Sequence, residues 1–216
     1  ADFDGVRVFA KPSGDATDDD ARAGAWRGVR AAVEAADRAQ WDDAAYRDEL
    51  VEWLRFNWSE VDEKRDGLVP TAGTPALPRW LGTRLAKWFF LRTATRIRAD
   101  LDDVETSSHL ALFTTTNDAP EGWVRLGVEL AEFLLAATEH DVAVAYLNQC
   151  CQVPEVAAKL KQDLGLPANE EPVLLLRLGT LPPSTMDVVQ KHPEVYKAPR
   201  RDVDDIILPA DDEPAS

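Results

Sequence analysis

The sequence is poor in the residues that build disulfide frameworks and metal sites. Its 216 residues include only two cysteines, the neighbours Cys150 and Cys151, and three histidines, His109, His140 and His192. Adjacent cysteines rarely bridge because the geometry is strained, so we expect two reduced thiols in a cytoplasmic protein. The histidines lack the spacing of metal ligands, and the sequence therefore predicts no metal site.

Long apolar runs and targeting signals are also missing. No run of about 18 apolar residues occurs, so no membrane span is predicted. Residues 1–4, Ala-Asp-Phe-Asp, show no basic region followed by an apolar stretch, so no signal peptide is visible. The chain begins without Met, which leaves open that a preceding segment was removed.

Basic residues are scarce, and only seven of the 24 are Lys. Against 39 acidic residues they leave a net charge of −15, which repels nucleic acid and anionic membranes and argues against both as partners. We interpret the charge as a solubilising surface. A hydrophobic content of 45% and seven Trp nevertheless predict a folded globular protein.

Standard catalytic motifs are absent as well. The sequence contains no G-x-G-x-x-G after a strand, no P-loop, no H-E-x-x-H and no G-x-S-x-G. No nucleophile, base and orienting group can therefore be assigned from the sequence, and the catalytic residues stay unknown.

The pattern of apolar residues predicts an α+β, or mixed α/β, domain. Strands are expected over 5–10, 109–116, 142–146 and 173–178, the last apolar on both faces as in a central strand. Helices are expected from Asp19 to about Gln40, from residue 42 or 43 to about 54, from Pro78 to about 98, from Pro120 to 138, and from Pro154 to Gly165.

Residues 60–78 mix charges with Gly and Pro, which is typical of an irregular connection that acts as a lid or binding loop. The helix expected after it carries Trp80, Trp88 and Phe89, which suit either a core or an interface between subunits. Its arginines are interpreted as a solvated face rather than an anion site; they are Arg79, Arg84, Arg92, Arg96 and Arg98.

Several segments occur in an order known from one family. The helix over 122–138 leads into 142–149, then a short helix, the strand Val173-Leu-Leu-Leu-Arg-Leu-Gly179, and Ala198-Pro-Arg-Arg-Asp202. Earlier in the chain stand Glu49-Leu-Val-Glu-Trp-Leu-Arg55 and Asp66-Gly-Leu68. This order resembles the nitroreductase-like FMN flavoproteins, especially their Acg-like branch.

The resemblance implies a single nitroreductase-like domain over 1–208, with a central, mostly antiparallel sheet flanked by helices. The terminal residues 209–216 are expected to form a flexible acidic tail. The resemblance further implies an FMN-dependent NAD(P)H oxidoreductase that reduces nitroaromatics, quinones or similar acceptors, and a homodimer. Two alternatives stay open: a non-catalytic protein that binds or sequesters flavin, and a degenerate member that acts as an interaction protein.

The resemblance also assigns cofactor-binding residues. Arg200 and Arg201 match the segment that faces the FMN phosphate, which guanidinium groups can hold bidentately. Asn148 and Gln149 match the loop whose backbone N–H groups contact the flavin N5. From the residues alone, the arginine pair is more often surface charge, and a helix-capping turn at the two amides is equally expected.

One departure from the family concerns its R-R-S/T-x-R segment, whose basic residues bind FMN. Nothing here matches it, since Arg22, Arg27 and Arg30 have other spacings on an amphipathic helix. The sequence thus starts partway into the family pattern, and pairing with a missing amino-terminal portion is the alternative to a homodimer.

Overall fold

The fold is described from a computed structural model, which covers residues 5–12, 19–69, 76–90, 93–182, 185 and 201–205. The chain divides into two compact units. The first contains Ala1–Asp43 and Arg92–Pro182, and the second contains Ala44–Leu91 and Pro183–Ser216. The expected single domain over 1–208 stays a prediction, and the tail over 209–216 lies outside the described residues.

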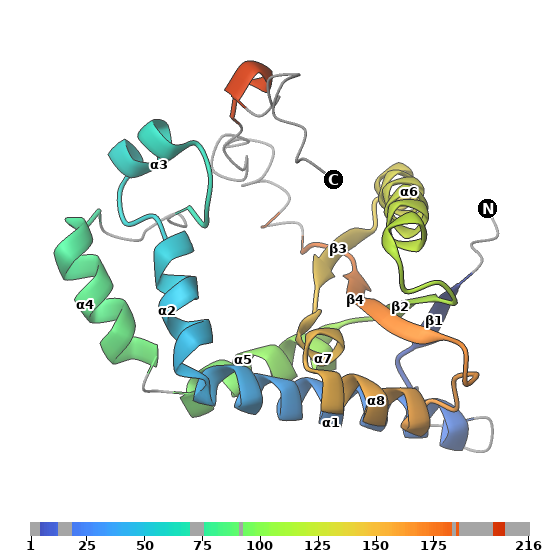
Figure 1. The fold of residues 1–216 in the computed structure, drawn as a ribbon. Coiled ribbons are helices and arrows are strands. Elements are labelled where there is room, and N and C mark those ends of the chain that lie inside the picture. Colours follow the sequence, from blue (N-terminus) through green and yellow to red (C-terminus); the bar gives the residue numbers. More distant parts are fainter. Residues whose placement is uncertain are drawn as a thin grey trace. The chain divides into compact units, whose positions relative to one another are not determined.

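The first unit is built on an antiparallel sheet (Figure 1). Among the described residues its order is β1 (Val6–Ala10), β2 (His109–Thr115), β4 (Glu171–Gly179) and β3 (Ala143–Tyr146). Each strand lies within two residues of its predicted position, and β4 is an inner strand as expected. The predicted mixed α/β fold with an antiparallel sheet is therefore confirmed.

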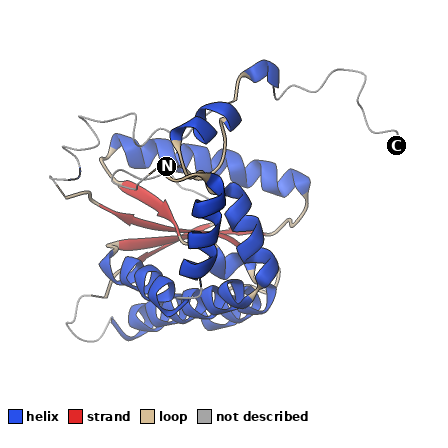
Figure 2. Ribbon diagram, turned by 90° about the vertical axis from the view of Figure 1, so that its left-hand side faces the viewer, coloured by secondary structure: helices blue, strands red, loops and turns tan. Residues whose placement is uncertain are grey.

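One face of this sheet is covered by α1 (Asp19–Asp42), α5 (Thr93–Thr106), α7 (Gln149–Gln152) and α8 (Pro154–Asp163), as Figures 1 and 2 show. Apolar residues recur along α1 at helical spacing, and Val29 and Val33 are fully buried. Burying such a side chain contributes about 1.5–3 kcal/mol, so this layer contributes substantially to the stability of the unit. The cluster also contains Val104, Leu110, Leu112, Leu160 and Leu175.

The opposite face is covered by α6 (Pro120–Glu139), which begins with Pro in its first turn as predicted. Phe113 of β2 meets Phe133 of α6 edge to face, with ring centroids 5.3 Å apart. In β4, Leu174 and Leu176 pack toward α6 while Leu175 packs toward α1. This explains why the strand is apolar at every position.

The second unit contains α2 (Ala44–Trp53), α3 (Trp58–Lys64), α4 (Arg79–Phe90) and the short helix η2 (Val203–Asp205). The prediction of an irregular connection from residue 60 is wrong for 60–64, which lie in α3. Asn57 caps this helix, because its side chain accepts a hydrogen bond from the Glu60 backbone N–H at 2.9 Å. The spacing Asn57-x-x-Glu60 is a helix-capping pattern, and it could have predicted where α3 begins.

The single helix predicted from Pro78 to residue 98 is also wrong. The structure has two helices there, α4 in the second unit and α5 in the first. The apolar residues of α5, Ile97, Leu101 and Val104, are buried or half-buried in the first unit. On α4, Trp80 and Trp88 are exposed by 71% and 56%, so they do not form a core in the structure, and their role in an interface stays a prediction.

None of the described helices is both long and apolar enough to span a bilayer.

Candidate functional site

The bend after β3 is tied to the neighbouring strand. The Leu147 backbone N–H donates to the carbonyl of Leu175 at 2.9 Å. The Asn148 side-chain oxygen in turn accepts from the Leu175 N–H at 3.0 Å. Asn148 thus continues the strand pairing with its side chain, and this pairing fixes where α7 begins.

The bend is also anchored to α1. Gln149 donates from Nε2 to Oδ1 of Asp37 at 3.1 Å, and Asp37 is only 2% exposed. A second side-chain hydrogen bond, from Gln40 Nε2 to Gln152 Oε1 at 3.0 Å, joins the same two helices, α1 and α7. A buried carboxylate is costly without hydrogen bonds, so Asp37 and Gln149 stabilise each other's position.

The side chains of Asn148 and Gln149 have the partners given above, whereas their backbone N–H groups have none in the part of the chain that the structure describes. The bend therefore offers backbone donors held in place by Leu175 and Asp37. This is the kind of contact that the family resemblance implies for the flavin N5.

Cys150 and Cys151 follow immediately, and both are free thiols, as the sequence predicted. Their Sγ atoms lie 4.0 Å apart, and Cys150 Sγ contacts the Leu147 carbonyl oxygen at 3.6 Å. The hydrogen bond with Cys150, together with burial, raises the pKa of the Cys151 thiol. A protonated thiol is a poorer nucleophile than a thiolate, so these contacts lower the reactivity expected of Cys151.

Arg201 lies in the second unit, where it forms an ion pair with Asp66. Asp66 also accepts from Nη2 of Arg55 at 2.5 Å, and Arg55 is buried. The hydrogen bond from Arg55, followed by that from Arg201, lowers the pKa of Asp66. The Glu49–Arg55 and Asp66–Leu68 segments of the resemblance therefore meet through Arg55 and Asp66.

The predicted cofactor residues are thus divided between the two units. Asn148 and Gln149 belong to the first, and Arg201 belongs to the second. Arg200 lies outside the described residues. That these residues share one cleft stays a prediction.

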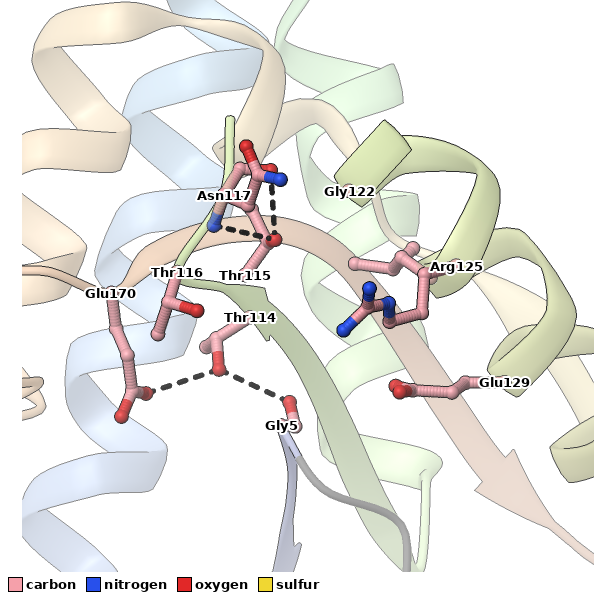
Figure 3. Close-up of a pocket in the computed structure, with 10 residues that line it drawn as sticks. Gly5, Thr114, Thr115, Thr116, Asn117, Gly122, Arg125, Glu129 and Glu170 are labelled. Atoms are coloured by element: carbon pink, nitrogen blue, oxygen red, sulfur yellow. Dashed lines mark hydrogen bonds between the residues drawn. The ribbon is translucent and has the colours of Figure 1, made fainter. Parts of the chain in front are cut away.

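A polar cavity of about 380 Å³, which sequence reasoning missed, lies at the carboxyl end of β2 (Figure 3). Because β2 and β3 are both antiparallel to β4, they run in the same direction. The carboxyl end of β3 therefore lies at the same end of the sheet as the cavity. A bulge between Phe113 and Thr114 shifts the register there, as bulges beside binding sites often do. The lining residues are Gly5, Thr114, Thr115, Thr116, Asn117, Gly122, Arg125, Leu126, Glu129 and Glu170.

The side chains of Thr114 and Glu170, both on the cavity wall, are linked to neighbouring groups by hydrogen bonds. The hydroxyl oxygen of Thr114 lies 3.1 Å from the Gly5 carbonyl oxygen and 3.0 Å from Glu170 Oε2, as the dashed lines in Figure 3 show, so its single proton is donated to one or the other. Glu170 also pairs with Arg7 at 2.8 Å, and that hydrogen bond lowers the pKa of Glu170. The carboxylate is therefore ionised at neutral pH.

The turn over the cavity needs glycine at position 122. A Cβ there would lie 1.9 Å from the Asn117 carbonyl oxygen, closer than any real contact. Asn117 is held in turn by Thr115, whose hydroxyl donates to that carbonyl at 3.1 Å. The available sequence signal was the run of three threonines and an asparagine, residues 114–117, at the carboxyl end of a buried strand. Its hydroxyl and amide groups can bind a polar ligand, whereas no cluster of metal ligands occurs among the described residues.

Comparison with known proteins identifies the fold. A solved structure of a substituted variant of NfnB, an FMN- and NADPH-dependent nitroreductase from Sphigopyxis sp. strain HMH, is similar to this chain, with a TM-score of 0.50 and 15% identity. The match covers 96% of this chain and 80% of the NfnB chain. Another variant matches 95% and 79%, with a TM-score of 0.49 and 15% identity. NfnB from Mycobacterium smegmatis, solved with NADPH, matches 78% and 75%, with a TM-score of 0.40 and 17% identity.

No protein-family model matches the chain, and neither does any curated protein. The match with a TM-score of 0.50 nevertheless covers 96% of the chain, and this gives a nitroreductase-like fold. At 15% identity it establishes the fold alone.

Proposed function

We propose that the chain is an FMN-dependent NAD(P)H oxidoreductase of the nitroreductase type, acting on nitroaromatic, quinone or similar acceptors. The observation that carries this proposal is the fold match over 96% of the chain to an enzyme described as FMN- and NADPH-dependent. The sequence resemblance supports it independently, because it was drawn from motifs rather than from the fold. The cofactor class is FMN, and NAD(P)H is the electron donor.

When bound, the flavin supplies the redox chemistry, taking a hydride from NAD(P)H and passing electrons to the acceptor. The chain's own task is to hold and orient it. In this assignment the backbone N–H groups of Asn148 and Gln149 would donate toward the flavin ring, and Arg200 and Arg201 would bind the phosphate. The donor types fit these acceptors, since guanidinium groups recognise phosphate and amides recognise ring nitrogens.

No acid–base constellation can be assigned from the sequence, and this is compatible with the proposed chemistry because a hydride transfer through a cofactor needs no side-chain nucleophile. One observation favours the alternative of an interaction protein without flavin. Arg201, the described member of the arginine pair, already has a carboxylate partner in Asp66 and so does not need a phosphate to balance its charge.

Turnover with NADPH tests the activity. Purified protein supplied with FMN should oxidise NADPH in the presence of a quinone or nitroaromatic, and Arg201→Ala should raise the FMN concentration needed for half-maximal rate. Arg38→Ala is the matched control, because Arg38 is an exposed, ion-paired arginine of α1. Flavin binding without turnover would leave only the sequestering alternative, and absence of flavin binding would leave only the interaction protein.

A further inference from the structure

Two Arg-Asp dipeptides, far apart in sequence, pair with each other in the second unit. Arg65 binds Asp202 through both guanidinium Nη atoms, at 2.5 and 2.9 Å. Asp66 binds Arg201. Each dipeptide thus supplies one cation and one anion, and we refer to the four residues Arg65, Asp66, Arg201 and Asp202 as the crossed clamp.

The 65–66 side of the crossed clamp is rigidly built. Arg55, whose side chain is 4% exposed, donates to the Glu52 and Leu54 carbonyl oxygens as well as to Asp66. Bidentate and charge-assisted bonds of this kind are short and directional. Asp66 is therefore held by a buried cation, and it presents its second carboxylate oxygen to Arg201.

The backbone around Asp66 is specialised for the same contact. Arg65 has a φ of 55° and Gly67 a φ of 79°, conformations that most side chains disfavour. A Cβ on Gly67 would lie 2.5 Å from the Trp53 carbonyl oxygen and 2.7 Å from Cζ of Arg55. Only glycine lets the chain close over the Arg55 guanidinium and place Asp66 beside it.

We propose that Asp66 is a positioning residue for Arg201 and that the crossed clamp holds residues 201–205 in the orientation that binds the flavin phosphate. This deepens, and rests on, the proposed FMN function. The pair with Asp66 engages Nη2 of Arg201. A guanidinium has five N–H donors, so the remaining edge of Arg201 stays able to bind a phosphate.

Affinity for FMN compared with riboflavin tests the assignment, because only FMN carries the phosphate. Asp66→Asn should weaken FMN binding by about tenfold or more, as expected for a lost charge-assisted contact, and leave riboflavin binding unchanged. Asp48→Asn, which removes an exposed ion pair with Lys87 in the same unit, is the control and should change neither. An equal loss for both flavins, or no loss, would overturn the positioning role.

A charge exchange tests the clamp without any flavin. Arg65→Asp should speed hydrogen exchange of residues 201–205, and adding Asp202→Arg should restore the slower rate. If the wild-type chain binds no FMN, the proposed function fails, while protection restored in the double variant still supports the clamp. Unchanged exchange in Arg65→Asp would overturn the clamp whatever the flavin result.

Discussion

At the scale of single residues, the polar groups of the candidate site are held by partners distant in sequence. Gln149 is held by Asp37 on α1, and Arg201 is held by Asp66. The residue types Asn, Gln and Arg could be singled out from the sequence. Their partners could not, because a hydrogen bond between residues more than a hundred positions apart leaves no local pattern.

Removing the buried carboxylate of Asp37 should loosen the bend. Asp37→Ala leaves the Gln149 amide without this acceptor, which costs about 1–3 kcal/mol in the free energy of unfolding. Urea denaturation measures the loss. Asp163→Ala, which removes an exposed pair with Lys159 on α8, should cost much less, and equal losses in the two variants would refute the anchoring role of Asp37.

The paired thiols should react slowly with alkylating reagents. The hydrogen bond with Cys150 and burial raise the pKa of Cys151, so little thiolate forms at pH 8. Iodoacetamide labelling followed by mass spectrometry should be far slower for the folded chain than in urea. Cys150→Ala removes the first of these causes and should speed labelling of Cys151; equal rates in folded and unfolded protein would contradict this account.

At the scale of helices and strands, the N-cap of α3, Asn57, allows a local test of stability in the second unit. Asn57→Ala removes the acceptor for the Glu60 N–H and the donor to the Leu77 carbonyl, at 2.9 and 3.0 Å. Loss of an N-cap typically costs about 1 kcal/mol. The denaturation midpoint should therefore fall, with Asn57→Ser recovering most of the loss; a variant as stable as wild type would show that the cap contributes nothing.

The edge strand β1 should respond to acid. Arg7 lowers the pKa of Glu170 from 4.5, so the stabilisation is complete above pH 4.5 and is lost as the pH falls through the lower folded value. Glu170→Gln should therefore lose stability at neutral pH but change less than wild type on acidification. Denaturation curves at pH 7 and below pH 4 measure this difference, and identical pH dependence in both proteins would contradict it.

Most helices and strands could be predicted because they bury regular apolar patterns. β4 is apolar on both faces because it lies between α1 and α6, and Pro120 and Pro154 begin their helices as expected. The division into α4 and α5 could not be predicted from periodicity, since both segments are amphipathic. The polar cavity escaped prediction because it depends on a bulge and on the close approach of Gly122 to Asn117.

At the scale of the whole molecule, several arginines of this acidic chain, whose net charge is −15, are paired with carboxylates. Arg7, Arg55, Arg65 and Arg201 all form ion pairs with residues far along the chain or across a turn. Under the proposed function, an arginine fixed in this way would bind the dianionic phosphate of FMN. We therefore expect FMN affinity to depend on the crossed clamp and to fall as salt screens these charges.

Direct titration of the purified chain with FMN, followed by flavin fluorescence and absorbance, tests the central claim. We expect saturable quenching and a shifted flavin spectrum, with riboflavin binding more weakly because it lacks the phosphate. Fluorescence and absorbance that stay those of free FMN at every protein concentration would contradict the assignment of this chain as a flavoprotein.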